Sequence, residues 1–143
     1  MSETSVVCPN CSVINTLPSE RLGDGPLCGK CREAMFAAKP VELTTATFER
    51  HVARNDIPLL VDFWAPWWGQ CLAMAAYLVS AAGRLEPGVR LAKLNTEDEQ
   101  MVGAQYGIRS IPTMILFKGG REVARRSGAM MTNQIIDWVQ SNL

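Results

Sequence analysis

The stretch Leu59-Leu60-Val61-Asp62-Phe63-Trp64 is followed at once by Ala65-Pro66-Trp67-Trp68-Gly69-Gln70-Cys71. The first six residues are apolar except for Asp62, and Pro58 precedes them. A run of this length and composition predicts a central buried strand. The spacing of apolar residues predicts a helix over 71–85 directly after it. The residues at helical spacing are Leu72, Ala75, Ala76 and Val79.

Helices and strands alternate on both sides of this stretch. The patterns predict helices over 44–55, 97–106 and from Thr132 to the end, and strands over 89–94, 113–117 and 122–126. Gly119-Gly120 forms the turn between the last two strands. The side chains expected to face inward from the last helix are Ile135, Ile136, Val139 and Leu143. This order predicts an α/β fold with a mixed central sheet flanked by helices.

Four of the five cysteines form two CxxC pairs. The pairs are Cys8 with Cys11 and Cys28 with Cys31. A two-residue spacer lets both sulfurs of a pair converge, and two such knuckles supply the four corners of a tetrahedron that soft thiolates offer to Zn²⁺. One structural zinc per chain is therefore expected, with a full ligand shell and no open position for water. The alternative is two redox-active or disulfide-linked pairs.

The segment before residue 40 is too small to fold by burial alone. Metal binding in comparable modules supplies on the order of 10 kcal/mol of folding free energy. Loop residues, with a short hairpin, are expected between the knuckles, and Lys39-Pro40 marks a boundary because the residue before proline is forced out of helix. We expect a zinc-knuckle module over 1–39 and a second domain over 40–143.

Composition excludes several classes of protein. The chain has 143 residues, 48% of them hydrophobic, with fourteen Lys+Arg and fourteen Asp+Glu. This apolar fraction excludes wholesale disorder, and the neutral balance argues against a nucleic-acid partner. The longest apolar run, 72–79, is too short for a membrane span, and residues 1–20 contain no secretory signal. We expect a cytoplasmic monomer, in a compartment where thiols stay reduced.

Two motifs carry a family resemblance. The segment 61–67, followed by Cys71, resembles thioredoxin, and so does the segment Ile108-Arg109-Ser110-Ile111-Pro112-Thr113. The match covers nearly all of 41–143, and the double knuckle narrows it to the zinc-bearing second type of bacterial thioredoxin. The resemblance implies a thioredoxin fold and protein-disulfide reductase activity. It also implies protein or peptide substrates with disulfides or extended segments, and electron supply by a flavoprotein thioredoxin reductase.

The chain departs from this family at the reactive motif. Family members carry Trp-Cys-Gly-Pro-Cys and then a basic residue, whereas this chain reads Trp67-Trp68-Gly69-Gln70-Cys71-Leu72. Trp68 stands at the position of the attacking cysteine, Gln70 replaces the proline and Leu72 replaces the basic residue. Only Cys71, which matches the family's resolving cysteine, is present.

Dithiol exchange needs one thiolate that attacks and a second thiol that resolves the mixed disulfide. The attacker is normally activated at a helix N-terminus, where Trp68 offers no nucleophile. If zinc holds four cysteines, Cys71 is the one thiol left. Two interpretations follow: an oxidoreductase that is impaired or uses Cys71 alone, and a non-catalytic module that binds peptides. Two alternatives for Cys71 itself are a buried, inert residue and a link between two chains through a metal or a disulfide.

Asp62 and Lys93 form a second candidate pair. A lone carboxylate in an apolar strand is costly unless it is partnered, and burial raises its pKa. Such a carboxyl could exchange protons with Cys71, which is the role that the resemblance implies for Asp62 together with Lys93. The alternative is a structural pair retained after the thiol chemistry was lost.

The resemblance also implies a substrate groove. It predicts a cis bond between Ile111 and Pro112 beside the active site, with neighbouring backbone groups free to pair with an extended peptide. Trp67, Gly128 and Ala129 would border this groove. The alternative is a proline that merely begins a strand.

His51 is the only histidine in the chain. Because Glu49 and Arg50 precede it in a predicted helix, we expect it on a solvated face. With no second histidine, the chain offers no Ser-His or Cys-His catalytic pair of the usual kind.

Overall fold

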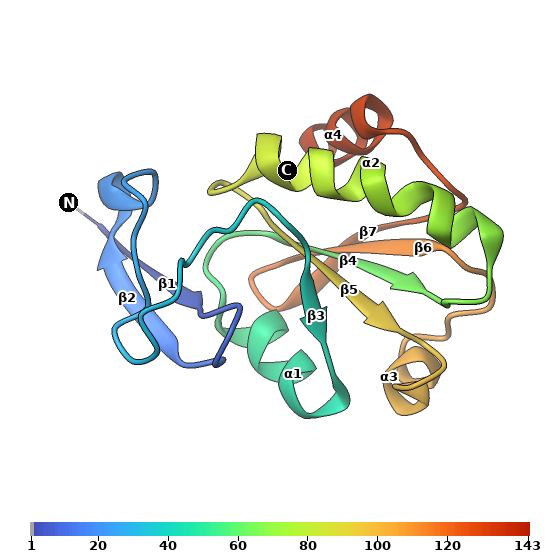
Figure 1. The fold of residues 1–143 in the computed structure, drawn as a ribbon, viewed down its shortest axis with the longest axis horizontal. Helices are drawn as coiled ribbons and strands as arrows, with labels where there is room; N and C mark the ends of the chain where they lie inside the picture. The colour runs from blue at the N-terminus through green and yellow to red at the C-terminus, as the bar shows by residue number, and fades with distance from the viewer. Residues whose placement is uncertain (1) are drawn as a thin grey trace.

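The computed structural model describes residues 2–143, which form two separate sheets. The smaller sheet is an antiparallel hairpin of β1 (Glu3–Val7) and β2 (Ile14–Pro18), followed by the short 3-10 helix η1 (Ser19–Arg21). It lies at one end of the molecule, on the left of Figure 1. Its turn carries the first CxxC pair, so the hairpin is not confined to the segment between the knuckles, where it was expected.

The larger sheet has the strand order β3-β5-β4-β6-β7. β4 (Leu59–Trp64) and β5 (Arg90–Asn95) run parallel at its centre, and β3 (Val41–Leu43) lies parallel to β5 at one edge. β6 (Thr113–Lys118) and β7 (Arg121–Ser127) complete the sheet in antiparallel directions. The mixed sheet is confirmed, while β3 was not expected because three residues carry no clear pattern.

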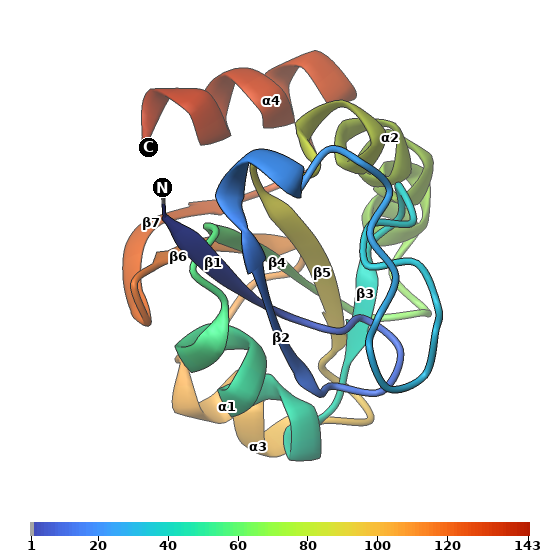
Figure 2. The same ribbon diagram turned by 90° about the vertical axis from the view of Figure 1, so that its left-hand side faces the viewer.

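Helices cover both faces of this sheet (Figures 1 and 2). α1 (Thr45–Arg54) and α3 (Gln100–Gln105) pack on one face, and α2 (Gly69–Leu85) and α4 (Thr132–Ser141) on the other. Thr44 precedes the first turn of α1 as expected. None of the helices in residues 2–143 combines the length and the apolar character needed to cross a lipid bilayer.

Alternation along β4 decides which side chains meet α2. Leu60 belongs to the core beneath α2 and α4, whereas Val61 and Phe63 belong to the core beneath α1 and α3. Successive side chains of a strand point to opposite faces, so Asp62 shares the α2 layer with Leu60. The four residues after Trp64 then lead directly into α2, which brings the start of this helix to the end of β4.

The buried face of α2 differs from the expected one. Leu72 is 56% exposed and Val79 is 48% exposed. The residues that face the sheet are Cys71, Met74, Leu78, Ala81, Ala82 and Leu85. This helix is apolar on several sides, so its sequence offers two competing stripes and the sheet selects between them. The helix also begins at Gly69, two residues before the expected start.

The ends of the last two helices also differ from expectation. α3 is shorter than 97–106 and ends before Gly107, whose φ of +64° suits glycine. Thr132 is the first residue of α4, and the carboxamide of Gln134 accepts the N–H of Met131 at 2.9 Å. Leu143 is half exposed, so its expected inward position is wrong. The other three inward residues of this helix are buried as expected: Ile135, Ile136 and Val139.

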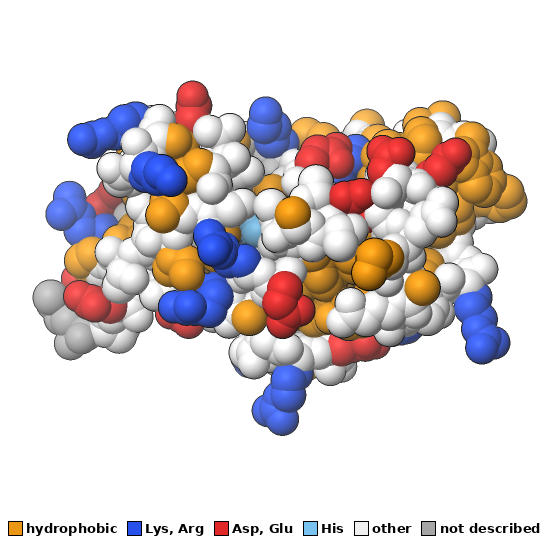
Figure 3. Space-filling model, turned by 90° about the horizontal axis from the view of Figure 1, so that it is seen from below, with side chains coloured by type: hydrophobic (Ala, Val, Ile, Leu, Met, Phe, Trp, Pro, Cys, Tyr) orange, Lys and Arg blue, Asp and Glu red, His pale blue; other side chains and the backbone are white. Residues whose placement is uncertain are grey.

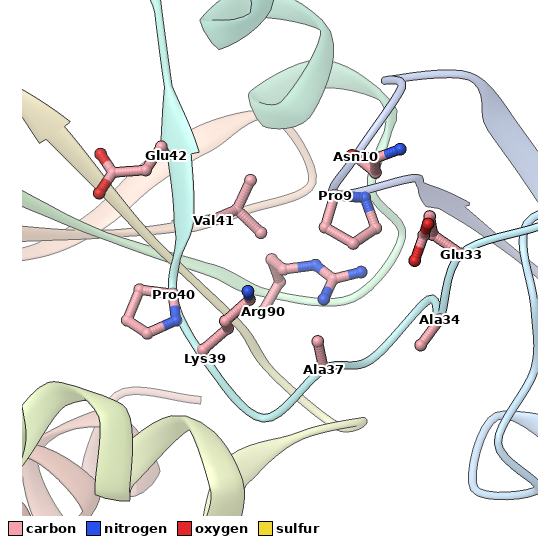
Figure 4. Close-up of a pocket in the computed structure, with 10 residues that line it drawn as sticks. All are labelled: Pro9, Asn10, Glu33, Ala34, Ala37, Lys39, Pro40, Val41, Glu42 and Arg90. Carbon is pink, nitrogen blue, oxygen red and sulfur yellow. The ribbon is translucent and has the colours of Figure 1, made fainter. Parts of the chain in front are cut away.

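Arg90 joins the N-terminal segment to the large sheet. Its side chain is fully buried and donates hydrogen bonds to the carbonyl of Met35 at 2.7 Å and to the carboxylate of Glu86 at 2.9 Å. Its guanidinium carbon also lies 4.7 Å from the centroid of the Phe36 ring. Figure 4 shows Arg90 among the residues that line a cleft of about 440 Å³ between this segment and β3. These contacts link the segment around Met35 to β5.

Candidate functional site

The two CxxC pairs converge on one point. The sulfur atoms of Cys8, Cys11, Cys28 and Cys31 all lie within 4.8 Å of one another. Two of these separations, Cys8 to Cys31 and Cys11 to Cys28, are 3.6 and 3.7 Å. Thiolates about 2.3 Å from a tetrahedral zinc stand about 3.8 Å apart, whereas a disulfide brings sulfurs to about 2.05 Å. The cluster therefore fits the expected structural zinc, and all four cysteines are free of disulfides.

Both knuckles follow the same backbone path. In each, the N–H of the first cysteine donates to the carbonyl five residues later, at 2.9 Å for Cys8 and 2.8 Å for Cys28. The residue after the second cysteine, Ser12 or Arg32, has a positive φ of 64° or 69°. The N–H two residues after the first cysteine points at its sulfur, at 3.3 and 3.4 Å. Such donors stabilise thiolates, the form that binds a metal.

The N-terminus of α2 presents an indole. Trp68 precedes the first turn, and its carbonyl accepts the N–H groups of Cys71 and Leu72 at 3.0 and 3.2 Å. The rings of Trp67 and Trp68 meet edge to face with centroids 5.6 Å apart, and they are 62% and 41% exposed. Figure 3 shows hydrophobic side chains gathered at its right-hand end, where α2 begins in Figure 1. The place where a thiolate would be stabilised is thus aromatic and apolar.

Cys71 lies in the first turn of α2 and faces the sheet. It is 3% exposed. Burial raises the pKa of its thiol; the backbone of Ala65 opposes this shift and the nearby Asp62 carboxyl adds to it. The thiol form therefore dominates at neutral pH, and this cysteine is shielded and weakly nucleophilic.

Asp62 is buried at 3% exposure, and its Oδ1 has no hydrogen-bond partner among residues 2–143. Burial raises the pKa of this carboxyl to about 7, while the charge of Lys93 acts in the opposite direction. Lys93 is its cross-strand neighbour, yet the ammonium lies 3.4 Å from the Glu42 carboxylate and 4.4 Å from the Trp64 ring centroid. The two residues are therefore neighbours without forming a direct ion pair.

A hollow of about 590 Å³ opens beside the two tryptophans. Trp67, Trp68 and Ile111 line it together with residues of α3 and the following loop. The bond between Ile111 and Pro112 is cis, as expected. Gly128 lies outside this lining, although its N–H donates to the carbonyl of Pro112 at 2.9 Å. Ala129 follows it, also outside the lining.

The α3 wall of the hollow and the role of Trp68 as a second aromatic wall were not expected from the sequence. The residues of α3 in this wall are Gln100, Gly103 and Ala104. The available signal was the pairing of two small residues, Gly103 and Ala104, on a short helix, which leaves space above them.

His51 is 1% exposed, so the expected solvated position is wrong. Its Nε2 lies 3.5 Å from the hydroxyl of Ser12, and the carboxamide of Asn55 on the same side accepts the N–H of Val7 at 2.8 Å. Burial lowers the pKa of His51 to about 4, and neighbouring arginines add to the effect. The N-terminal hairpin covers this side of α1, which the sequence of the helix could not reveal.

Two family models match the chain. The model described as Thioredoxin matches residues 39–141, and the model described as Thioredoxin 2, N-terminal, a zinc ribbon, matches residues 7–33. The chain belongs to the thioredoxin family. It has the thioredoxin fold with an N-terminal zinc ribbon, and the family relation supports a thioredoxin-like redox role and a structural zinc ion.

Two relatives agree with this assignment in sequence, and one solved structure agrees with it in fold. Thioredoxin C-3 of Corynebacterium nephridii is 37% identical over 138 residues, which cover 96% of this chain and 94% of that protein. Thioredoxin 1 of Nostoc sp. is 39% identical over 102 residues, covering 71% and 95%. The solved structure of a mutant thioredoxin from Halobacterium salinarum superposes with a TM-score of 0.66 at 24% identity, over 73% of this chain and 91% of that one.

The four-cysteine cluster predicts one zinc ion per chain, measurable by elemental analysis of protein purified under reducing conditions. Cys28→Ser should lose this zinc and lower the melting temperature, because a structural zinc supplies on the order of 10 kcal/mol to such a module. Cys71→Ser, which removes the thiol outside the cluster, should retain the metal. A zinc-free wild-type protein with oxidised Cys8 and Cys31 would contradict the assignment.

The buried Asp62 predicts a pH-dependent stability. Its pKa of about 7 in the folded state exceeds the value of about 3.9 in an unfolded chain, so the folded protein binds more protons between these values. The contribution of Asp62 to the free energy of unfolding therefore falls as pH rises from about 4 to about 7 and is constant above that pH, while His51, whose pKa is lowered to about 4, contributes with the opposite sign below about pH 6.5. Asp62→Asn should remove this fall and raise stability at pH 8 by up to about 4 kcal/mol.

Urea denaturation between pH 5.5 and 8.5 measures this difference. The gain of the Asp62→Asn variant should grow as the pH rises to about 7 and stay constant above it. Asp137→Asn, which alters an exposed carboxylate, is the matched control and should follow the wild-type curve. Parallel curves for wild type and Asp62→Asn would contradict the buried carboxyl.

Proposed function

We propose that this protein is a thioredoxin-like protein-disulfide oxidoreductase scaffold in cell redox homeostasis, in which dithiol turnover is lost. At most it acts as a monothiol through Cys71. The observation that carries this proposal is the indole of Trp68 at the N-terminus of α2. Indole has no nucleophilic atom and no proton to exchange near neutral pH, so the attacking step has no group at its usual place.

The zinc cysteines do not substitute for the missing thiol. The hairpin that carries the first knuckle lies at one end of the molecule and the start of α2 lies at the other (Figure 1). The sulfurs of the knuckles are also within 4.8 Å of one another, in position to share a metal. Cys71 is therefore the only thiol available for exchange among the described residues.

A monothiol reaction needs an external partner. Cys71 loses its proton, and its thiolate attacks one sulfur of a substrate disulfide; that S–S bond breaks, and a mixed disulfide and a substrate thiolate form. We propose Asp62, a buried carboxyl in the same layer, as the acceptor of this proton, with Lys93 as its charged neighbour. The thiolate of a low-molecular-weight thiol must then attack the substrate sulfur of the mixed disulfide, so that Cys71 leaves as a thiolate; a second such thiol frees the substrate sulfur and forms the small-molecule disulfide. Burial of Cys71 makes the first step slow.

A second candidate function is peptide binding without catalysis. The observation that favours it is the pair of exposed tryptophans beside a hollow of about 590 Å³. Exposed aromatic residues that line a concave surface are typical of binding sites. An extended peptide would lie along Trp67, Ile111 and Pro112, and continue toward Gly128 and Ala129.

The remaining roles follow from the family and the thiol content. We propose that 1–39 is the structural zinc module and 40–143 the thioredoxin domain. Disulfide-containing proteins or extended peptides are the proposed partners, together with a flavoprotein thioredoxin reductase. Four metal-binding thiolates and a free Cys71 suit a reducing compartment, so we place the protein in the cytoplasm. We also propose that it is a monomer.

If dithiol turnover is lost because Trp68 replaces the attacking cysteine, restoring a cysteine at this position should restore activity. The wild type, with a flavoprotein thioredoxin reductase and NADPH, should show no sustained reduction of insulin disulfides. Trp68→Cys should raise turnover by at least about 100-fold, since removal of a nucleophile commonly costs more than that. Trp68→Cys combined with Cys71→Ser should abolish the gain. Wild-type turnover equal to that of the repaired variant would reject this proposal.

The binding function predicts an interaction that needs no thiol chemistry. Alkylated insulin B chain is a suitable extended probe, and the fluorescence of the exposed tryptophans reports its binding. Trp68→Ala should weaken affinity by about tenfold or more, since an aromatic anchor contributes about 1.4 kcal/mol or more. Tyr77→Ala is the matched control, because Tyr77 is also 41% exposed but lies outside the hollow. Equal affinities of the wild type, Trp68→Ala and Tyr77→Ala for the alkylated B chain would argue against binding at this site.

A further inference from the structure

Three charged residues stand in a row on the face of the sheet that α2 covers. Cross-strand register pairs Glu42 of β3 with Lys93 of β5, and Lys93 with Asp62 of β4. Val41 and Leu43, on either side of Glu42, belong to the core of the opposite face. Figure 4 shows Glu42 and Val41 pointing to opposite sides of β3. The register therefore adds Glu42 as a third charged residue beside the pair of Asp62 and Lys93.

Exposure falls along this row from the edge of the sheet inward. The side chain of Glu42 is 64% exposed and that of Lys93 is 22% exposed, whereas Asp62 is 3% exposed. The Lys93 ammonium contacts the outer member, at 3.4 Å from the Glu42 carboxylate, and lies over the Trp64 ring at 4.4 Å. Asp62 forms no ion pair within residues 2–143. The Lys93 ammonium, the one cation of the row, therefore lies beside the exposed Glu42.

We propose that Glu42 is a positioning residue that holds the Lys93 ammonium at the edge of the sheet and so leaves the Asp62 carboxyl without an ion-pair partner. Glu42 does not touch the reacting thiol and acts only through Lys93. A carboxyl without a partner remains protonated to a higher pH than one that faces an ammonium. Glu42 thereby keeps the pH at which Asp62 can accept a proton higher than it would be with the ammonium beside the carboxyl.

Among the groups packed around Asp62, Lys93 is the charged residue whose position can change the pKa of this carboxyl. Lys93 on β5 is the cation that acts on this carboxyl, and Cys71 on α2 is the other titratable group coupled to it. Its neighbour on β6, Met114, carries no charge. Moving the ammonium from the edge toward Asp62 would oppose the burial that raises the carboxyl's pKa.

This inference deepens the proposed role of Asp62 as proton acceptor for Cys71 and rests on that function. The test therefore follows Asp62 itself and not activity. The carboxyl ¹³C signal of Asp62, identified by its loss in Asp62→Asn, is titrated in the zinc-loaded full-length chain. Glu42→Gln should lower the midpoint by about one pH unit, because the released ammonium turns toward Asp62. Since Glu42 is largely exposed, this variant should fold.

A double-variant cycle distinguishes positioning from a direct charge effect. Lys93→Met should raise the midpoint, and Glu42→Gln should add no measurable shift in that background; Lys93→Gln serves if the methionine variant does not fold. Glu122→Gln, which removes another ion-paired glutamate on β7, is the matched control and should leave the midpoint unchanged. An unchanged midpoint in Glu42→Gln, or the same shift with Lys93 removed, would overturn the inference.

The pH profile of Cys71 alkylation separates this inference from the proposed function. If both hold, the profile should shift with the Asp62 midpoint in Glu42→Gln. A shifted midpoint with an unchanged alkylation profile would support the positioning by Glu42 and reject the proton transfer between Asp62 and Cys71.

Discussion

The N-terminus of α2 is the physical feature on which the function of this protein depends. Free N–H groups and the partial positive charge of a helix start stabilise a thiolate, and β4 delivers the chain directly to this position. Trp68 occupies it, while Cys71 lies within the first turn and faces the sheet. The scaffold for thiol exchange is therefore complete in its backbone, and the reacting sulfur at its most favourable point is replaced by an apolar ring.

The zinc-binding segment and the large sheet are connected by buried polar contacts and by an apolar cluster in which Val6 and Met35 pack with Ile57. Arg90 reaches from β5 to the backbone at Met35 and stacks on Phe36, while Asn55 at the end of α1 accepts the N–H of Val7. Each contact satisfies a group that would be costly if buried alone. The zinc cluster thus stabilises a structural extension of the domain, at the end of the molecule away from the start of α2 (Figure 1).

Strong local patterns made much of this structure predictable. The apolar run of β4 and the CxxC spacing are short-range patterns that restrict the backbone strongly, whereas the cis bond before Pro112 was predicted from the family resemblance. Weaker patterns gave wrong predictions where contacts with segments distant in the sequence determine which side chains are buried. The apolar stripe of α2 was placed wrongly because several of its sides are apolar, and His51 was expected in solvent because the hairpin that covers it is distant in sequence. The contact of Lys93 with Glu42 was missed because β3 is only three residues long.

The sequence alone determined the type of the long helices and strands of the second domain, the metal-binding set and the absence of a cysteine at position 68, because these depend on residue identity and short-range spacing. Tertiary structure decided which groups are buried together. It placed Asp62 in the α2 layer with a raised pKa, drew Lys93 toward Glu42, and opened the hollow beside Trp68. Burial and charge pairing depend on segments far apart in the chain, and only the folded sheet brings those segments into register.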